Sequence, residues 1–350
     1  MRRRITTAFF CLILLSGSSF ANQERLAFIY YYAWYGNEES DSLWIHWQDY
    51  GHQPPEDLSS AYYPRLGSYS SRDAAIIDQH MRWIAGANLN VLIYSWWGRN
   101  DRTDAVAKPV LDAAADYNLR VAFMIEPYEG RTSAGVLSDI EYIHERYGNH
   151  PAFFRFARKT SYGPSSAQRT FIFLYQPDFS DEELKRLSDA VHAGSCDSIL
   201  LLQSTDASLI DRTHADGIFV YEAVQPIMDL YPGIAESVRS EESIFIPCVS
   251  PGFNVNRTFR NKSSLFRPRA KGKTYDKWWE RTLVAEPEFV AILTFNEWHE
   301  GTQIEPAVRN KKFGNRYLSY EHAYKKRGKV AQESYLRRTA RWIDLFQQLP

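Results

Sequence analysis

The sequence predicts a single-domain (β/α)8 barrel, the TIM-barrel class of α/β fold. Eight apolar runs of strand length recur along the chain, and amphipathic segments of helix length separate them. Strand and helix alternating eight times in one domain is typical of this barrel, whose functional side chains gather after the strands. A doubly wound open sheet is the alternative, but the glycine-rich phosphate loop that such sheets often carry follows none of the runs.

The expected strands are rich in apolar and β-branched residues, as buried parallel strands require. They are residues 26–32, 91–95, 121–125, 171–175, 199–203, 217–221, 244–249 and 289–295. The expected helices are residues 71–87, 104–117, 137–147, 181–192, 208–214, 231–239, 274–286 and 332–349. Ser180 followed by Glu183 is the pattern of a capping box, which marks the start of the fourth helix.

The first 21 residues are typical of a secretory signal peptide. Three arginines precede an apolar stretch that extends to Leu15, and Ser19 and Ala21 are placed for cleavage before Asn22. An uncleaved membrane anchor is the alternative, but the apolar stretch is short for a span. We therefore expect residues 22–350 to form one exported barrel domain, periplasmic or extracellular, without stable membrane insertion.

Composition excludes several classes of protein. Without residues 1–21, the remaining 329 residues carry 38 basic and 42 acidic side chains, and a net charge of −4 leaves no footprint for nucleic acid. Only Cys196 and Cys248 remain, and the sequence does not decide whether they form a disulfide. A fold held together by several disulfides is excluded. The sequence favours a monomer without cofactor or metal. The histidines at positions 46, 52, 80, 150 and 299 do not fall at the spacings of metal ligands.

The expected centre of the site is residues 295–301, with the sequence FNEWHEG, at the end of the last strand. Glu297 and Glu300 are three residues apart, close enough to face one cavity. Two carboxyl groups in an aromatic setting suit acid and base catalysis on a glycosidic bond, because one can be held protonated while the other stays ionised. Two solvated glutamates at a strand end are the alternative.

Aromatic side chains follow most of the expected strands. The chain contains 10 Trp, 22 Tyr and 20 Phe, and about fifty residues separate the first two strands, far more than an ordinary connection. Sugars stack on such rings, so the pattern predicts a carbohydrate cleft. The residues expected to line it are Tyr32, His46, Trp96, Trp97, Glu126, Tyr128, Tyr221, Asn254, Asn296, Trp298 and His299.

Two basic stretches do not require a functional explanation. Residues 257–273 carry seven Lys or Arg side chains, which could bind phosphate but are more simply a solvated loop. Residues 325–327, with the sequence KKR, are most simply a solvated turn.

Several motifs together resemble glycoside hydrolase family 99, the endo-α-1,2-mannosidases and mannanases. They are HQPP at 52–55, YPRLGSYSS at 63–71, EPY at 126–128, YG at 147–148, SPG at 250–252 and FNEWHEGTQIE at 295–305. The resemblance extends from about residue 26 to Glu305, in order and with the expected spacings. It implies a (β/α)8 barrel that cleaves inside α-1,2-linked mannosyl chains of mannan or high-mannose glycans with retention and without a metal.

The resemblance also implies roles for individual residues. Glu297 matches the base that removes the proton from the sugar 2-hydroxyl, which closes a 1,2-anhydro intermediate. Glu300 matches the acid that protonates the leaving oxygen and later activates water. An ordinary double displacement with a Glu nucleophile is the alternative mechanism.

Further positions match residues of the family that contact the substrate. Tyr32, Glu126, Tyr221 and Asn296 match residues that line the cleaved mannose, and Trp97 matches an aromatic against the next sugar outward. Trp instead of Tyr at that position favours mannose over glucose there. The alternatives are an endomannosidase that releases glucosyl-mannose and a non-hydrolytic carbohydrate-binding or glycosyltransferase-associated barrel.

Overall fold

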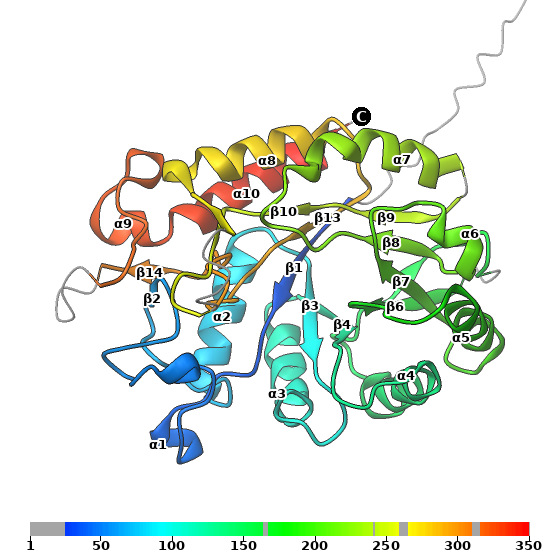
Figure 1. The fold of residues 1–350 in the computed structure, drawn as a ribbon, viewed down its shortest axis with the longest axis horizontal. Coiled ribbons are helices and arrows are strands. Elements are labelled where there is room, and N and C mark those ends of the chain that lie inside the picture. The colour runs from blue at the N-terminus through cyan, green and yellow to red at the C-terminus, as the bar shows by residue number, and fades with distance from the viewer. Residues whose placement is uncertain (1–24, 164–166, 241, 259–264, 310–315, 350) are drawn as a thin grey trace, which may run out of the picture.

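A computed structural model describes residues 25–163, 167–240, 242–258, 265–309 and 316–349, and its central sheet is the predicted parallel barrel (Figure 1). Hydrogen-bonded neighbours follow the order β10-β13-β1-β3-β4-β6-β7-β8-β9, all parallel. The strands are β1 (Leu26–Tyr31), β3 (Val91–Trp96), β4 (Arg120–Ile125), β6 (Gln168–Leu174), β7 (Ser198–Gln203), β8 (Gly217–Phe219), β9 (Ile244–Ile246), β10 (Cys248–Val249) and β13 (Phe289–Ile292). The expected signal peptide lies outside the described residues.

The barrel closes through a strand that Pro247 divides. The run at 244–249 was expected as one strand, but β9 pairs with β8 and β10 pairs with β13. Proline has no N–H for a sheet ladder, so the strand breaks at this residue and its two halves face different neighbours. The last strand also ends earlier than expected, at Ile292 instead of residue 295. The segment after it is therefore free to form the loop that carries Glu297.

Helices surround the barrel between consecutive strands. They are α2 (Ala74–Gly86), α3 (Arg102–Asp116), α4 (Ser133–Tyr147), α5 (Asp181–Ala193), α6 (Leu209–Thr213), α7 (Tyr231–Ser240), α8 (Lys273–Leu283), α9 (Gly328–Gln332) and α10 (Ser334–Gln347), with the short α1 (Glu38–Asp41) in the first loop. The capping box of Ser180 and Glu183 is confirmed, since each side chain bonds the other residue's main-chain N–H. Figure 1 shows α8 and α10 side by side on one flank of the barrel, with α9 at one end.

Five shorter strands and four 3-10 turns also lie within the described residues. The strands are β2 (Tyr63–Pro64), β5 (Phe156–Ala157), β11 (Phe253–Asn254), β12 (Phe266–Arg267) and β14 (Ala307–Val308), of which β5 pairs with β6. The turns are η1 (Asp49–Gly51), η2 (Ile227–Leu230), η4 (Ala270–Gly272) and η6 (Ala323–Lys325). The pairing of β2 with β14 fastens the long first loop to the segment beyond the last barrel strand. This contact brings residues about 240 positions apart to the same end of the barrel.

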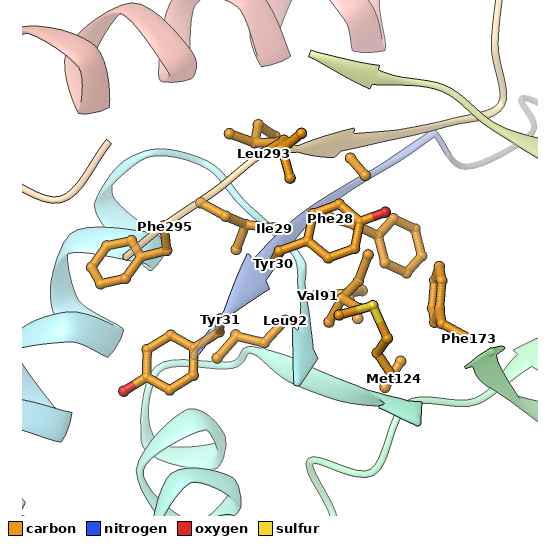
Figure 2. Close-up of a cluster of buried hydrophobic side chains, with 14 of the residues drawn as sticks. Phe28, Ile29, Tyr30, Tyr31, Val91, Leu92, Met124, Phe173, Leu293 and Phe295 are labelled. Carbon is orange, nitrogen blue, oxygen red and sulfur yellow. The ribbon is translucent and has the colours of Figure 1, made fainter. Parts of the chain in front are cut away.

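Alternate residues of β1 point to opposite sides of the sheet. Figure 2 shows Phe28 and Tyr30 directed toward Phe173, and Tyr31 directed the other way. The Phe28 and Phe173 rings lie 6.1 Å apart, centroid to centroid. The Tyr31 hydroxyl lies 3.1 Å from Nδ1 of His80 on α2. Even-numbered side chains of β1 therefore fill the barrel, and odd-numbered ones anchor the helical layer.

The interior becomes more polar toward the ends of the strands. At the lower level Phe28 packs on Phe289 at 5.9 Å, in a layer of phenylalanine rings. One level higher, the Tyr30 ring lies 5.0 Å from that of Tyr221. At the top, the hydroxyls of Tyr32 and Tyr221 are 2.7 Å apart. The same alternation that builds the apolar core thus delivers tyrosine hydroxyls to the mouth of the barrel.

Two further expectations can be compared with the structure. Cys196 and Cys248 are both free, so the disulfide left open by the sequence is not formed. No helix among the described residues is long and apolar enough to cross a membrane.

We predict that Gly217→Ala destabilises the barrel. A Cβ at this position would lie 2.1 Å from the Ile244 carbonyl oxygen of the neighbouring strand, so β8 and β9 would have to separate. We expect a loss of about 1–3 kcal/mol of unfolding free energy in urea denaturation. The control is Gly233→Ala in α7, where a Cβ meets open space and alanine should gain about 0.5–1 kcal/mol. Equal effects of the two substitutions would contradict the close strand approach.

Candidate active site

The loop after β13 carries the two expected glutamates and is fixed from within the protein. Thr294 Oγ1 accepts a hydrogen bond from the Glu297 main-chain N–H at 2.9 Å. The Tyr35 hydroxyl donates to the Asn296 carbonyl at 3.1 Å and accepts the Trp298 N–H at 3.0 Å. Because the main chain is bonded on both sides of Glu297, the direction of this side chain is set before any ligand binds.

Glu297 is a buried carboxylate with main-chain donors. Only 3% of the residue is exposed, and Oε1 accepts the His299 N–H at 2.9 Å. Burial raises its pKa well above the ordinary value, and negative charge on Glu300 raises it further, whereas the N–H groups of His299 and Glu300 favour the ionised form. The two carboxyl groups cannot both ionise readily, so the pair retains a proton near neutral pH.

Glu300 faces the tyrosines at the top of the barrel. The Tyr221 hydroxyl donates to Glu300 Oε2 at 3.1 Å, so the short contact between Tyr221 and Tyr32 is donated by Tyr32. Burial raises the pKa of Glu300 to about 7, with a smaller rise from the charge on Glu222 and a lowering by the Tyr221 hydrogen bond. A carboxyl group with a pKa near neutrality can donate and accept protons under the same conditions.

The main chain of Glu300 is held against the loop after β10. The Asn254 N–H donates to the Glu300 carbonyl at 2.7 Å. The following residue, Gly301, has a φ of 64°, and a Cβ there would lie 3.0 Å from the Asn254 carbonyl oxygen. Glycine permits both this conformation and this approach. The Asn254 side chain bonds the Asn256 N–H at 3.1 Å, so we assign Asn254 a bracing role in the described structure.

A third carboxyl group, Glu126, joins the pair. It is 2% exposed and lies at the end of β4, where the Ser95 hydroxyl donates to Oε1 at 2.6 Å. The Trp97 indole N–H donates to the same Ser95 oxygen at 3.1 Å. Burial raises the pKa of Glu126 to about 8, opposed by Ser95 and Arg131 and assisted by Glu300. Glu126 is therefore mostly protonated at pH 7 and can donate a hydrogen bond.

An aromatic hollow of about 440 Å³ opens beside these groups. Its lining residues are Trp34, Ile45, His46, Trp97, Asp101, Arg102, Thr103, Tyr128 and Glu129. The Trp34 ring lies 6.0 Å from the Trp97 ring and 4.8 Å from the Tyr32 ring. Glu297 and Glu300 do not line this hollow, but Tyr32 connects it to Glu300 through Tyr221. The arrangement offers stacking surfaces that extend away from the carboxyl groups.

His46, Asp49 and His299 come together although their sequence spacing indicated no metal site. Their ligand atoms lie within 4.8 Å of one another. However, His299 Nε2 is 2.6 Å from the His46 carbonyl oxygen, an acceptor, so this nitrogen carries the proton and cannot also bind a metal. Burial lowers the pKa of His299 to about 4, which keeps the ring neutral. The cluster is thus a hydrogen-bond network in the wall of the site.

Beneath the loop lies a buried carboxylate, Glu305, that the expected site did not include. It is 0% exposed, and Oε2 accepts the Trp298 indole N–H at 2.9 Å and the Tyr69 hydroxyl at 2.8 Å. Oε1 faces Nε2 of His80 at 3.3 Å. This network joins the loop to the long first connection and to α2.

Three residues expected to contact the substrate serve the frame of the site instead. Trp96 is 0% exposed and donates its indole N–H to Asp104 at 3.1 Å. Successive side chains of a strand point to opposite faces, so Trp96 faces the helical layer whereas Ser95 and Trp97 face the barrel interior. Trp298 is also 0% exposed and is bound to Glu305. The Asn296 amide accepts the Tyr32 N–H at 2.8 Å and donates to the Tyr32 carbonyl at 2.7 Å, so it fixes the strand end.

The remaining expected residues, Tyr32, Glu126, Tyr221, Trp97, His46, Tyr128 and His299, gather at the same end of the barrel. Trp34 and Ser95 were missed. The sequence does contain a signal for Trp34. It lies two residues after Tyr32, and alternate residues of a strand point to the same side, so Trp34 is expected to point inward with Phe28, Tyr30 and Tyr32. Ser95 precedes the Trp pair at the end of β3, but nothing in the sequence indicates its contact with Glu126.

The basic stretch at 257–273 is more buried than a solvated loop. Arg257 pairs with Asp57, and Arg269 lies 4.8 Å from the ring centre of Tyr62. Arg269 is 9% exposed and donates to the carbonyls of Gly301 and Gln303 at 2.9 and 2.5 Å. The expectation of a solvated loop is therefore wrong for Arg269, which supports the far end of the loop after β13. Residues 259–264 lie outside the described part of the stretch.

A parallel barrel with paired buried glutamates at its strand ends and an adjoining aromatic hollow defines a glycoside hydrolase. Residues 22–348 match Glycosyl hydrolase family 99, and the chain belongs to this family. It is 32% identical over 351 residues to mouse glycoprotein endo-alpha-1,2-mannosidase, covering 91% of this chain and 74% of that protein. The predicted family, barrel and enzyme class are thereby confirmed.

Solved structures agree with this assignment. The structure of the GH99 endo-alpha-mannosidase from Bacteroides thetaiotaomicron superposes with a TM-score of 0.82 at 31% identity, covering 93% of this chain and 98% of that one. The rat glycoprotein endo-alpha-1,2-mannosidase is 32% identical over 330 residues, which is 83% of this chain and 70% of the relative. The similarity therefore extends over the barrel as a whole.

We predict that Glu305→Leu costs about 3–5 kcal/mol of unfolding free energy, because it leaves the buried Tyr69 hydroxyl without its acceptor and the Trp298 indole N–H with only its longer bond to Tyr69, at 3.2 Å. Glu305→Gln retains an acceptor oxygen and should cost less, about 1–3 kcal/mol. Urea denaturation measures both. Glu182→Gln, which removes one partner of an exposed pair with Arg186, is the control and should stay within about 0.5 kcal/mol of wild type. A Leu variant as stable as the control would contradict the role of Glu305.

Proposed function

We propose that the protein is an exported, retaining endo-acting hydrolase of internal α-1,2-mannosidic linkages in mannan or high-mannose glycans. The observation that carries the proposal is the set of three buried carboxyl groups, Glu126, Glu297 and Glu300, beside an aromatic hollow in a family 99 barrel. The names of its relatives, endo-alpha-1,2-mannosidases, support the linkage. The pattern of residues 1–21 supports export.

In the proposed mechanism, the substrate supplies its own nucleophile. Glu297 takes the proton of the sugar 2-hydroxyl, and that oxygen attacks the anomeric carbon as Glu300 protonates the departing glycosidic oxygen. Because the 2-hydroxyl of mannose is axial, it stands opposite an axial leaving group and can attack from the far face. The 1,2-anhydro sugar then opens when Glu300 removes a proton from water and Glu297 returns its proton to O2. Two inversions at the anomeric carbon give retention.

The surroundings of each carboxyl group suit these roles. Main-chain N–H groups donate hydrogen bonds to Glu297 and so stabilise its ionised form before it acts as base. Tyr221 is the only side-chain donor to Glu300 among the described residues. Protonated Glu126 can hold a sugar hydroxyl without adding a third negative charge. Trp34 and Trp97 offer apolar surfaces for the sugar next to the cleaved one.

The proposal predicts different defects for the two glutamates. Glu300→Gln should lower hydrolysis of α-1,2-mannan by about 10²- to 10⁴-fold but affect a substrate with an activated leaving group much less, since that group needs little protonation. Glu297→Gln should impair both substrates.

The measurement is disaccharide or longer product release from yeast-type mannan, read by size, with initial rates on the activated substrate. Wild type that releases no oligosaccharide from mannan or from glucosylated high-mannose glycan would overturn the function. Two variants that behave alike on the activated substrate would overturn only the division of roles.

The pH dependence of kcat/KM should reflect Glu300. The proposed acid must be protonated, so activity should fall as pH rises through about 7, where Glu300 ionises. Tyr221→Phe removes a hydrogen bond that favours the ionised form, so it should move this limb to higher pH. Glu222→Gln removes a negative charge that disfavours ionisation and should move the limb to lower pH. Shifts in the same direction for both variants would contradict the assignment.

Trp97 should determine which sugar is accepted next to the cleaved mannose. A large ring at this wall accommodates the axial 2-hydroxyl of mannose better than the equatorial one of glucose, a difference of about 1–3 kcal/mol. We predict a preference of roughly ten- to a hundredfold in kcat/KM for mannosyl-mannose over glucosyl-mannose, which Trp97→Tyr narrows or reverses. If Trp97→Tyr lowers the Tm but leaves this kcat/KM ratio unchanged, Trp97 is only a packing residue. The residue would then give no reason to prefer mannosyl-mannose over glucosyl-mannose as the substrate.

A further inference from the structure

A second hollow, distant in the chain from the catalytic loop, lies on the outer flank where α8, η6, α9 and α10 meet (Figure 1). Its volume is about 340 Å³. Its lining residues are Asp276, Tyr324, Lys325, Lys326, Val330, Ser334, Arg337, Arg338 and Arg341. It shares none of them with the aromatic hollow beside the catalytic carboxyl groups.

Cationic side chains dominate this hollow because three separate segments contribute them. Ser334, Arg337, Arg338 and Arg341 are spaced three, four and seven residues along α10 and so share one helix face. Lys325 and Lys326 come from the turn η6 and its end. The lining contains five cationic side chains and one carboxylate, Asp276.

The single carboxylate is already used by one of the arginines. Asp276 Oδ1 accepts Arg338 Nε at 2.6 Å and the Trp342 indole N–H at 3.0 Å. The Arg338 guanidinium also lies over the rings of Tyr324, at 5.4 Å, and Trp342, at 4.9 Å. The negative charge of Glu280 also attracts the Arg338 guanidinium, but Glu280 does not line the hollow. Arg338 is thus a fixed, neutralised part of the wall.

The other cations are not neutralised. Arg337 binds Glu333 at 2.7 Å, but the same carboxylate binds Arg65 at 2.6 Å and cannot balance both charges. Lys325, Lys326 and Arg341 are exposed to solvent, and among the residues that the structure describes none of the three makes an ion pair. Like charges brought to one concave surface repel each other, and an anion between them would remove that repulsion.

The backbone of the turn that carries the two lysines adopts the left-handed conformation. Tyr324 and Lys325 have φ values of 50° and 61°, in the left-handed region that non-glycine residues adopt at about 1–2 kcal/mol each. The Tyr324 hydroxyl holds the turn in place through the Gly272 carbonyl, at 3.2 Å.

We propose that this hollow binds a phosphate group, with Lys325, Lys326 and Arg341 as its cationic contacts and Arg337 at the edge. A tetrahedral dianion carries enough charge and enough acceptor oxygens to meet several ammonium and guanidinium groups at once. The phosphate is either inorganic or esterified to a sugar, and the two sources share this chemistry. The site is independent of the proposed catalytic function, since its lining contains no residue of that machinery.

The test measures binding of inorganic phosphate and of mannose 6-phosphate by calorimetry, with sodium chloride of equal ionic strength and unphosphorylated mannose as references. The variants are the double substitution Lys325→Gln with Lys326→Gln, and separately Arg341→Gln. The matched control is Lys108→Gln with Lys185→Gln, which removes two exposed charges from α3 and α5. Thermal unfolding establishes that each variant is folded.

We expect saturable binding of at least one phosphate compound to wild type, weakened roughly tenfold or more in the site variants and unchanged in the control. Equal binding of the two compounds identifies free phosphate as sufficient, and tighter binding of the ester identifies a phosphorylated glycan. The rate of mannan cleavage should be the same in all these variants. Absence of binding beyond that of sodium chloride, or equal weakening in the site and control variants, would overturn the proposal.

Discussion

The position of Glu297 and Glu300 depends on a third glutamate, Glu305, buried beneath their loop. Glu305 is enclosed within the protein and accepts the Trp298 indole N–H and the Tyr69 hydroxyl on one oxygen. At the other end of the loop, Arg269 donates to the carbonyls of Gly301 and Gln303. The loop is therefore held by a buried carboxyl group and a buried guanidinium group. Removing either side chain would leave its buried hydrogen-bond partners unpaired, so these two positions tolerate few substitutions.

The barrel interior reconciles an apolar core with a site that needs several ionisable groups. Phenylalanine rings fill the lower layers, whereas the upper layer presents the hydroxyls of Tyr32 and Tyr221. Burial then raises the pKa values of Glu297, Glu300 and Glu126 together. Each additional negative charge is disfavoured by the others, so part of this group of carboxyls remains protonated near neutral pH. The same low-dielectric surroundings that stabilise the fold thus prepare an acid for catalysis.

Much of the fold could be predicted because buried parallel strands leave a strong signal. Each is apolar on both faces, so its run of residues is visible without knowledge of its neighbours. This property also explains the error at Trp96: when both faces of β3 are apolar, the sequence does not indicate that Trp97 points inward and Trp96 points toward the helices. The division of the seventh strand at Pro247 could have been recognised from the missing N–H of proline.

The parts of the site that escaped prediction are those created by contacts between distant segments. Ser95 is significant only because β4 places Glu126 beside it, and Glu305 only because α2 brings His80 within 3.3 Å. The basic flank is a similar case. Residues 325–327 are exposed, as expected of a solvated turn, but α10 places Arg341 in the same hollow as Lys325 and Lys326. Local patterns determine which elements form, whereas charge accumulates at a site only through their packing, so a concentration of unpaired charge in the folded protein is evidence that the sequence alone does not contain.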